Sequence, residues 1–150
     1  MAKVEASAER TIDAPADAVY GYLADMRRHA NFLPPQFSDF QVVEGGVGAG
    51  SVTTFAVTAG GRTRNYRMRV TEPAPGRTLV ESDADSSLVT TFNVEPLGGK
   101  SLVRISTSWD GAGGIGGFFE KTFAPKAMRR IYLDELDRLN TYAVAQQPVN

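Results

Sequence analysis

The sequence predicts one α+β domain in which an antiparallel sheet of about seven strands packs against a long C-terminal helix. Three observations support this fold class. A strand-like stretch and two short helical segments come first, followed by six strand-like stretches joined by turns rich in Gly and Pro. No segment between those six is long enough for a helical crossover, so the strands should run antiparallel. Residues 114–142 then carry an apolar helical stripe, which must be buried against the sheet.

Composition narrows the functional classes. The 150 residues suit a single domain, 1–150, with one core. The 16 basic and 17 acidic residues are interspersed, which argues against a partner such as nucleic acid. The chain has no cysteine, which excludes disulfides, a catalytic thiol and thiolate metal ligands. We find no apolar signal segment and no run of 18 uncharged apolar residues, and expect a soluble cytoplasmic protein without integral membrane association.

The N-terminal part predicts one strand and two short helices. Lys3 to Ile12 alternates apolar and polar residues, which is typical of a strand. Pro15 indicates a helix start, because proline is tolerated in the first helical turn. One face of this helix is apolar and carries Val19, Tyr22, Leu23 and Met26. A second helical segment from Arg27 to Phe32 should end before Pro34, since a residue that precedes proline avoids helical geometry.

Six further strands are expected in succession. They cover residues 40–44, 51–59, 62–71, 77–82, 88–95 and 101–109. Gly60 and Gly61 predict a tight hairpin, because a two-residue turn of the favoured hand needs positive φ. Longer turns are expected at 45–50, 72–76 and 96–100, and together these strands predict a meander.

The C-terminal helix is expected to be interrupted at Pro125, which removes a backbone donor and clashes with the preceding turn. After the proline, an apolar stripe consists of Met128, Ile131, Tyr132, Leu136, Leu139 and Tyr142. Before it, the apolar residues are Ile115, Phe118, Phe119 and Phe123, displaced by roughly 140° from the later stripe. We expect the later half to pack on the sheet and the earlier half to face a pocket.

Several segments resemble a known superfamily. They are IDAPADAVY at 12–20, LADM at 23–26, FLP at 32–34, PGRTL at 75–79 and the final helix. Together with the element order, they resemble the START-like (SRPBCC, Bet v 1-like) superfamily, in particular its polyketide cyclase/dehydrase and lipid-transport group. The resemblance covers nearly the whole chain. It implies a helix-grip fold, with the sheet curved around the long helix, and a cavity between them for a lipid, a polyketide or another hydrophobic molecule.

Alternation and bulk indicate which residues line that cavity. The expected inward rows are Phe55 and Val57, then Leu88, Phe92 and Val94, then Ile105, Thr107 and Trp109. The expected ligand-binding residues are Phe55, Tyr66, Met68, Glu81, Phe92, Trp109, Phe119 and Phe123. Large aromatic residues can also simply fill a core, so the cavity itself rests on the resemblance.

The strand at 62–71 carries the most informative polar residues. Tyr66 and Met68 alternate with Arg67 and Arg69, and we favour the arrangement in which the arginines face water. The resemblance to aromatase/cyclase relatives implies instead an inward arginine that orients substrate oxygens, and Arg69 matches that position. Glu81 would then be either a buried partner of that arginine or part of an ion pair on the outer face.

Two other features have competing interpretations. The only histidine, His29, follows two arginines, and we expect it on the surface. Residues 111–116 match the glycine pattern of a dinucleotide site, but no strand follows the helix, so we interpret them as a glycine-rich gate. The acidic residue at the corresponding distance, Asp134, lies four residues from both Arg130 and Arg138, where a surface ion pair accounts for it.

The favoured function is binding or carriage of a small hydrophobic molecule, without metal, nucleotide or covalent cofactor, because no triad, metal cluster or acid–base pair emerges from the sequence. A polyketide cyclase/dehydrase-like enzyme that uses Arg69 is the second hypothesis. A domain whose gated pocket controls binding to another protein is the third. The sequence does not decide whether two copies of the protein form a weak homodimer.

Overall fold

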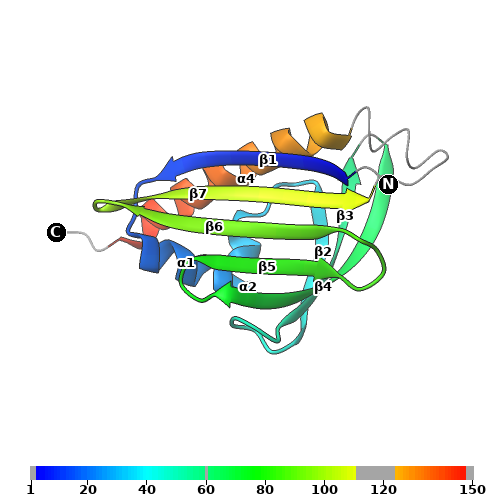
Figure 1. Ribbon diagram of the computed structural model, residues 1–150, viewed down its shortest axis with the longest axis horizontal. Helices are drawn as coiled ribbons and strands as arrows, with labels where there is room; N and C mark the ends of the chain where they lie inside the picture. The colour runs from blue at the N-terminus through cyan, green and yellow to red at the C-terminus, as the bar shows by residue number, and fades with distance from the viewer. Residues whose placement is uncertain (1–2, 60, 111–123, 148–150) are drawn as a thin grey trace.

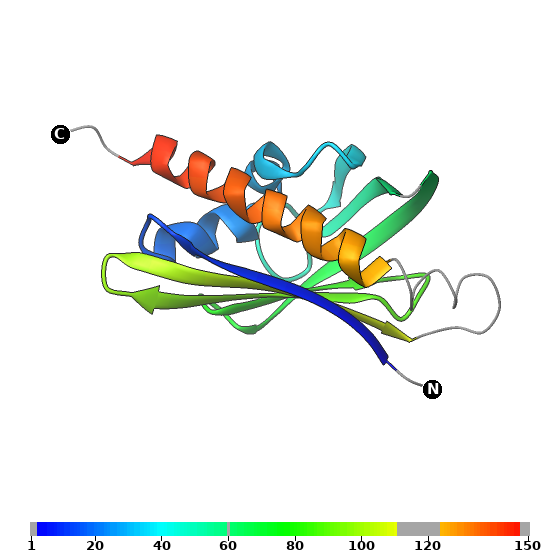
Figure 2. The same cartoon turned by 90° about the horizontal axis from the view of Figure 1, so that it is seen from above.

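The computed structural model describes residues 3–59, 61–110 and 124–147. In chain order the elements are β1 (Lys3–Ile12), α1 (Ala16–Ala24), α2 (Met26–His29), a 3-10 turn (Ala30–Phe32), β2 (Phe37–Glu44), β3 (Val52–Ala59), β4 (Arg62–Ala74), β5 (Thr78–Asp83), β6 (Val89–Leu97), β7 (Lys100–Asp110) and α4 (Ala124–Gln146). The strands form one curved sheet that wraps around α4, with α1 toward one end and α2 nearer the middle (Figures 1 and 2). This confirms the predicted α+β helix-grip fold.

The sheet is an antiparallel meander whose first strand is placed last. Its order is β1-β7-β6-β5-β4-β3-β2. β1 pairs with β7 without interruption, from Lys3 opposite Asp110 to Ile12 opposite Ser101. The other edge strand is β2, whose pairing with β3 shifts register twice. The two edges therefore differ, since one has a continuous ladder and the other an irregular ladder.

Two boundaries differ from the prediction. β4 continues to Ala74, through Pro73, which was expected in a turn. The pairing with β5 shifts register between Thr71 and Ala74, and such an irregularity accommodates a residue without an N–H donor. Asp25 separates Met26 from α1, because its backbone is extended and its side chain accepts hydrogen bonds from the first backbone N–H groups of α2.

Helix α4 is described from Ala124 to Gln146, and Pro125 is its second described residue. The stripe predicted after the proline is confirmed: Ile131, Tyr132, Leu136 and Leu139 are buried, and Met128 and Tyr142 are half-buried. On the outer side the expected ion pair joins Asp134 Oδ1 and Arg138 Nε at 3.1 Å. The predictions for 111–123, including the glycine motif, the earlier apolar residues and the division of the helix, lie outside the described residues. No described helix is long and apolar enough to cross a membrane.

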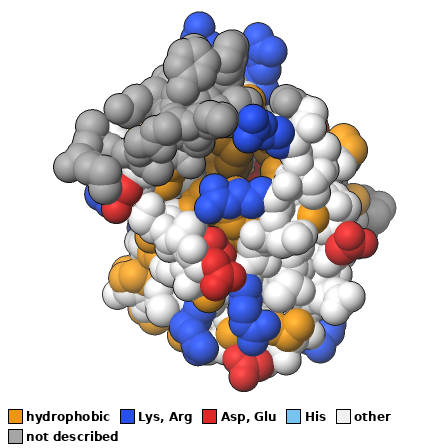
Figure 3. Space-filling model, turned by 90° about the vertical axis from the view of Figure 1, so that its right-hand side faces the viewer, with side chains coloured by type: hydrophobic (Ala, Val, Ile, Leu, Met, Phe, Trp, Pro, Cys, Tyr) orange, Lys and Arg blue, Asp and Glu red, His pale blue; other side chains and the backbone are white. Residues whose placement is uncertain are grey.

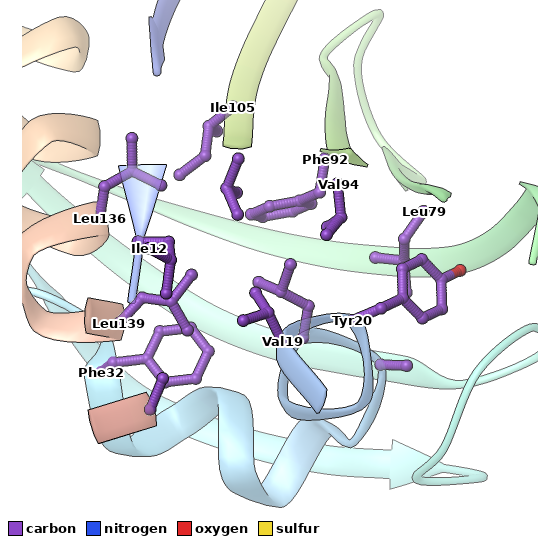
Figure 4. Close-up of a cluster of buried hydrophobic side chains, with 14 of the residues drawn as sticks. Ile12, Val19, Tyr20, Phe32, Leu79, Phe92, Val94, Ile105, Leu136 and Leu139 are labelled. Atoms are coloured by element: carbon purple, nitrogen blue, oxygen red, sulfur yellow. The ribbon is translucent and has the colours of Figure 1, made fainter. Parts of the chain in front are cut away.

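The core fills the end of the molecule that carries α1. Side chains from β1, α1, strands β4 to β7 and α4 meet there, and Figure 4 shows many of them. The largest fully buried members are Phe32, Ile12, Leu23, Met26, Leu79, Ile105, Leu136 and Leu139. Burial of each such side chain contributes about 1.5–3 kcal/mol relative to exposure, so this end supplies much of the stability.

A glycine-rich loop, residues 45–50, holds α2 in place. Gly46 O accepts a hydrogen bond from the Met26 N–H at 2.8 Å, and the Gly48 N–H donates to Ala24 O at 2.9 Å. Gly48 has φ +69°, and a Cβ there would lie 2.4 Å from Glu72 Oε1, so the site requires glycine. Because both bonds reach the residues around the start of α2, the loop also fixes the position of His29 at its end.

Candidate functional site

A cavity lies between the sheet and α4, at the opposite end from α1. Its described lining comes from α2, α4 and strands β2 to β6, and consists of His29, Leu33, Phe37, Phe40, Phe55, Val57, Tyr66, Met68, Glu81, Leu88, Thr90, Phe92, Met128, Tyr132 and Glu135. Figure 3 shows this end of the molecule, where hydrophobic side chains lie at the bottom of a recess edged by Lys or Arg side chains. The lining is mostly apolar with a few polar groups, which is typical of small-molecule sites.

One wall of the cavity is aromatic. Phe55 on β3 contacts three rings: Phe37 at 5.4 Å between centroids, Phe40 at 6.1 Å and Tyr66 at 5.7 Å. The Phe40 and Phe55 rings are nearly parallel, with 18° between their planes. The pairs join β2, β3 and β4, so the aromatic wall spans the irregular edge of the sheet. Such rings present broad flat apolar surfaces to a ligand.

The opposite side of the cavity contains a polar row across the sheet. In the strand register Glu81 of β5 lies opposite Thr90 of β6, and Thr90 lies opposite Thr107 of β7. The hydroxyls of Thr90 and Thr107 are 2.8 Å apart, and Thr107 also hydrogen-bonds the Tyr132 hydroxyl of α4. This row lies immediately beside the apolar row of Leu79, Phe92 and Ile105, because inward residues alternate along each strand.

A buried ion pair joins α2 to α4 beside this row. His29 Nδ1 is 3.0 Å from Leu23 O, and His29 Nε2 is 3.3 Å from Glu135 Oε2. A carbonyl oxygen only accepts, so Nδ1 must carry a proton. If Glu135 is ionised, Nε2 also donates, and the histidine is an imidazolium. His29 stacks on Phe32 with 5.0 Å between ring centroids, which fixes the plane of the ring.

The site raises the pKa values of three groups, His29, Glu81 and Tyr132. Burial lowers the pKa of His29, but the Glu135 hydrogen bond and the negative charges of Glu81 and Glu135 outweigh it and raise the pKa to about 9. Burial also raises the pKa of Glu81 above its ordinary value, and the charge of Glu135 adds to this while His29 opposes it. Tyr132 has a raised pKa because it is buried. The site thus holds ionisable groups whose proton affinities depend on one another.

Glu81 differs from its neighbours because its carboxyl has no hydrogen bond with any described residue, although its side chain is only 8% exposed. Glu135 has His29, and Thr90 has Thr107. A buried polar group without a partner is costly, so such a group in a cavity is a candidate for contact with a ligand. Chemically, the arrangement offers apolar walls and one open carboxyl beside a charged pair.

Most of the predicted lining is confirmed. Among the expected ligand-binding residues, Phe55, Tyr66, Met68, Glu81 and Phe92 line the cavity; their contact with a ligand stays a prediction. Trp109 is buried elsewhere, in a small cluster with Val4 and Ala6, and is not among the described lining. Phe119 and Phe123 lie outside the described residues.

The favoured arrangement, in which the arginines of β4 face water, agrees with the structure, whereas the alternative role of Arg69 in the cyclase hypothesis does not. Arg69 and Arg67 are exposed, because Met68 and Val70 occupy the inward positions of β4. Arg69 is not among the described residues of the lining, so the inward arginine of the cyclase hypothesis is not at this position. The buried neighbour of Glu81 is His29 instead of an arginine.

The expectation that His29 lies on the surface is also wrong, since it is 3% exposed. A signal was present: His29 lies three residues after Met26 and three before Phe32, both fully buried, and so continues the apolar stripe. Glu135 was missed, although it lies three residues after Tyr132, within the stripe of α4. Charged residues inside an apolar stripe were therefore the pointers to this site.

The part of α4 after the proline has a wider role than predicted. We expected it to pack on the sheet, and Leu136 and Leu139 do so. Met128, Tyr132 and Glu135, however, line the cavity. Residues three and four apart share one helix face, so one stripe serves both core and cavity. In the described residues no group of three His, Cys, Asp or Glu side chains has the arrangement of a metal site.

Comparisons with known proteins agree with this architecture. The solution structure of the KanY protein is 39% identical and covers 96% of this chain and 99% of its own, with a TM-score of 0.85. The crystal structure of the Zhui aromatase/cyclase from Streptomyces sp. R1128 is 16% identical, covers 97% of this chain and 96% of its own, and has a TM-score of 0.77. A START superfamily protein from Mycobacterium smegmatis is 13% identical, with coverages of 96% and 99% and a TM-score of 0.74. The last two show the fold alone.

None of the curated proteins compared with the chain matches it. Residues 1–144 match the family described as polyketide cyclase/dehydrase and lipid transport. This match spans every described strand and all but the last residues of α4, and it confirms the START-like resemblance. The chain belongs to the polyketide cyclase/dehydrase and lipid transport family.

Proposed function

We propose that this protein binds a small hydrophobic molecule in the cavity between the sheet and α4, and that it carries or senses this molecule in the cytoplasm. The observation that carries the proposal is the cavity itself, with its aromatic wall and its few polar groups at one side. A filled core would have placed apolar side chains against α4 along the whole sheet, as happens at the α1 end.

The cavity must adapt to its ligand. The space open to water inside it is about 40 Å³, enough for roughly three water molecules. A ring-sized ligand therefore requires side chains to move apart. Phe40 and Phe55 are only half-buried, and β2 pairs irregularly with β3, so we expect the aromatic wall to yield first.

Native mass spectrometry of the protein purified from its host tests this proposal. We expect a mass increment that disappears on denaturation and corresponds to one hydrophobic molecule. Methyl NMR locates the site, because Met68 and Met128 line the cavity whereas Met26 is buried elsewhere in the core. A shift of the first two methyl signals without the third supports the proposal. An empty protein whose methyl signals do not respond to any added apolar compound contradicts it.

The second candidate function is an acid–base enzyme on a polyketide-like substrate. One observation favours it: a carboxyl with a raised pKa beside a histidine–carboxylate pair, inside an apolar cavity. Aldol cyclisation of a linear poly-β-ketone followed by dehydration releases one water as the aromatic ring forms, so mass spectrometry can follow the loss of one water from a synthetic poly-β-keto thioester. Faster loss with the native protein than with Glu81→Gln supports catalysis. Equal rates contradict it and leave the carrier proposal unaffected.

A further inference from the structure

The carboxyl of Glu81, which has no hydrogen bond from a described residue, indicates what kind of ligand the cavity binds. Its side chain is buried on β5, it lines the cavity, and no described residue supplies it with a hydrogen bond. A carboxyl that faces a mostly apolar cavity without a hydrogen bond from a described residue is poorly stabilised, and a donor that enters with the ligand would stabilise it. The ligand is therefore expected to bring a hydrogen-bond donor to this point.

The polar groups nearest to Glu81 are already engaged within the protein. His29 donates to Leu23 O through Nδ1 and faces Glu135 through Nε2. The hydroxyls of Thr90 and Tyr132 both interact with Thr107. The described lining consequently offers carboxyl oxygens as acceptors, whereas its N–H donors are occupied within the protein.

We propose that Glu81 selects the polar end of the ligand: the cavity favours an aromatic molecule with a hydroxyl or ammonium group and rejects a molecule with a carboxylate, such as a free fatty acid. This inference rests on the proposed hydrophobic-ligand function and adds the chemistry of the polar end. The aromatic body faces Phe37, Phe40, Phe55 and Tyr66, and the donor faces Glu81.

The groups around Glu81 explain the selection. His29 of α2 and Glu135 of α4 form a pair whose charges largely compensate one another, so an ionised Glu81 would set the charge that a ligand meets. A ligand carboxylate would meet the two glutamates Glu81 and Glu135, and like charges at close range in a dry site repel strongly. An ammonium or a hydroxyl would instead form a charge-assisted hydrogen bond. His29 and Glu135 act here as positioning residues.

The test uses four probes that share one ring system: naphthalene, 2-naphthol, 2-naphthylmethylamine and 2-naphthoate. Dissociation constants are measured at pH 7 from the methyl NMR signals of Met68 and Met128, with Met26 as internal control. In the native protein we expect the naphthol or the amine to bind at least about tenfold more tightly than naphthalene, as one charge-assisted hydrogen bond would give. Naphthoate is expected to bind most weakly.

Glu81→Gln provides the decisive variant, because the amide has nearly the same shape, has no charge and adds an N–H donor. The amine should lose its advantage, and naphthoate should bind at least as tightly as naphthalene. Glu95→Gln, on an exposed position of β6, is the matched control and should keep the native order.

The outcomes separate this inference from the function on which it rests. Naphthalene that binds as well as the naphthol and the amine, or an unchanged order in Glu81→Gln, would overturn the role of Glu81 while the hydrophobic-ligand function stands. Failure of all four probes to shift Met68 or Met128 would contradict that function and the inference together. A tighter amine identifies an ammonium ligand, a tighter naphthol identifies a hydroxyl ligand, and either result supports the inference.

Discussion

The two ends of the interior are built from the same strands and the same helix but differ in content. At the α1 end, the inward row of Leu79, Phe92 and Ile105 packs with Leu136 of α4 in a closed apolar core. Two residues along the same strands, the inward row is Glu81, Thr90 and Thr107, and Glu135 faces it from the helix. A shift of two residues along each strand therefore leads from the packed core to the candidate site.

This difference indicates that the apolar end contributes mainly to stability and the polar end mainly to function. The apolar row gains free energy from burial, whereas the polar row must compensate for the loss of water around its charges. A well-packed apolar row would hold α4 against the sheet equally well, so the polar row is not explained by stability. The four predictions below compare the two ends, from the largest expected effect to the smallest.

Leu136→Ala should lower the free energy of unfolding by about 3–4 kcal/mol, because it removes a fully buried side chain from the closed core. Phe55→Ala, at the half-buried aromatic wall, should cost less stability but weaken probe binding by more than Leu136→Ala does. Urea denaturation and the methyl NMR titration provide the two measurements. If both variants lost the same stability and neither changed binding, the two ends would not differ as described.

Glu135→Leu should cost about 2–3 kcal/mol, somewhat less than is usual for a broken buried pair, because His29 can release its proton. The double variant, His29→Leu with Glu135→Leu, should recover most of this loss, since both buried charges are then absent. Urea denaturation of the two single variants and the double variant measures the coupling. A double variant less stable than either single variant would show that the pair supports the fold.

The native protein should lose about 2 kcal/mol of stability as the pH rises from 6.5 to 9. The pKa of His29 is raised from 6.5 to about 9 in the folded state, so its contribution is complete below pH 6.5 and is lost through pH 9. The raised pKa of Glu81 acts with the same sign, because the folded state holds its proton more tightly than the unfolded state. Urea midpoints across this pH range should be flatter for His29→Gln.

Arg69→Gln should change stability by less than about 0.5 kcal/mol and leave probe binding unaltered, since this side chain faces water on the outer side of β4. Arg69→Gln is the smallest expected effect. Weakened binding in this variant would restore the inward arginine that the resemblance implied. Thermal unfolding and the naphthalene titration are sufficient to measure it.

The sequence predicted the fold well because its signals are local. Alternation, glycine turns and the stripe of α4 report on neighbours within a few residues, and they placed all of the described strands to within a few residues. The polar part of the site is not local. His29 and Glu135 are 106 residues apart, and each lies beside charged neighbours, Arg28 and Asp134, that are typical of a surface. Their contact depends on how α2 and α4 cross, which no periodicity encodes.

The position of β1 has a consequence for how the chain is made. Among the described strands, β1 is made before the others, but its partner in the described sheet is β7, which is made about a hundred residues later. During synthesis its unpaired backbone could associate with other chains. Charged side chains at Lys3, Glu5 and Glu9 alternate with small apolar residues along β1. When the β1 strands of two chains lie side by side in register, their like charges would repel one another. The pairing of β1 with β7 is thus the contact of longest sequence separation in the sheet, and contacts of this kind slow folding.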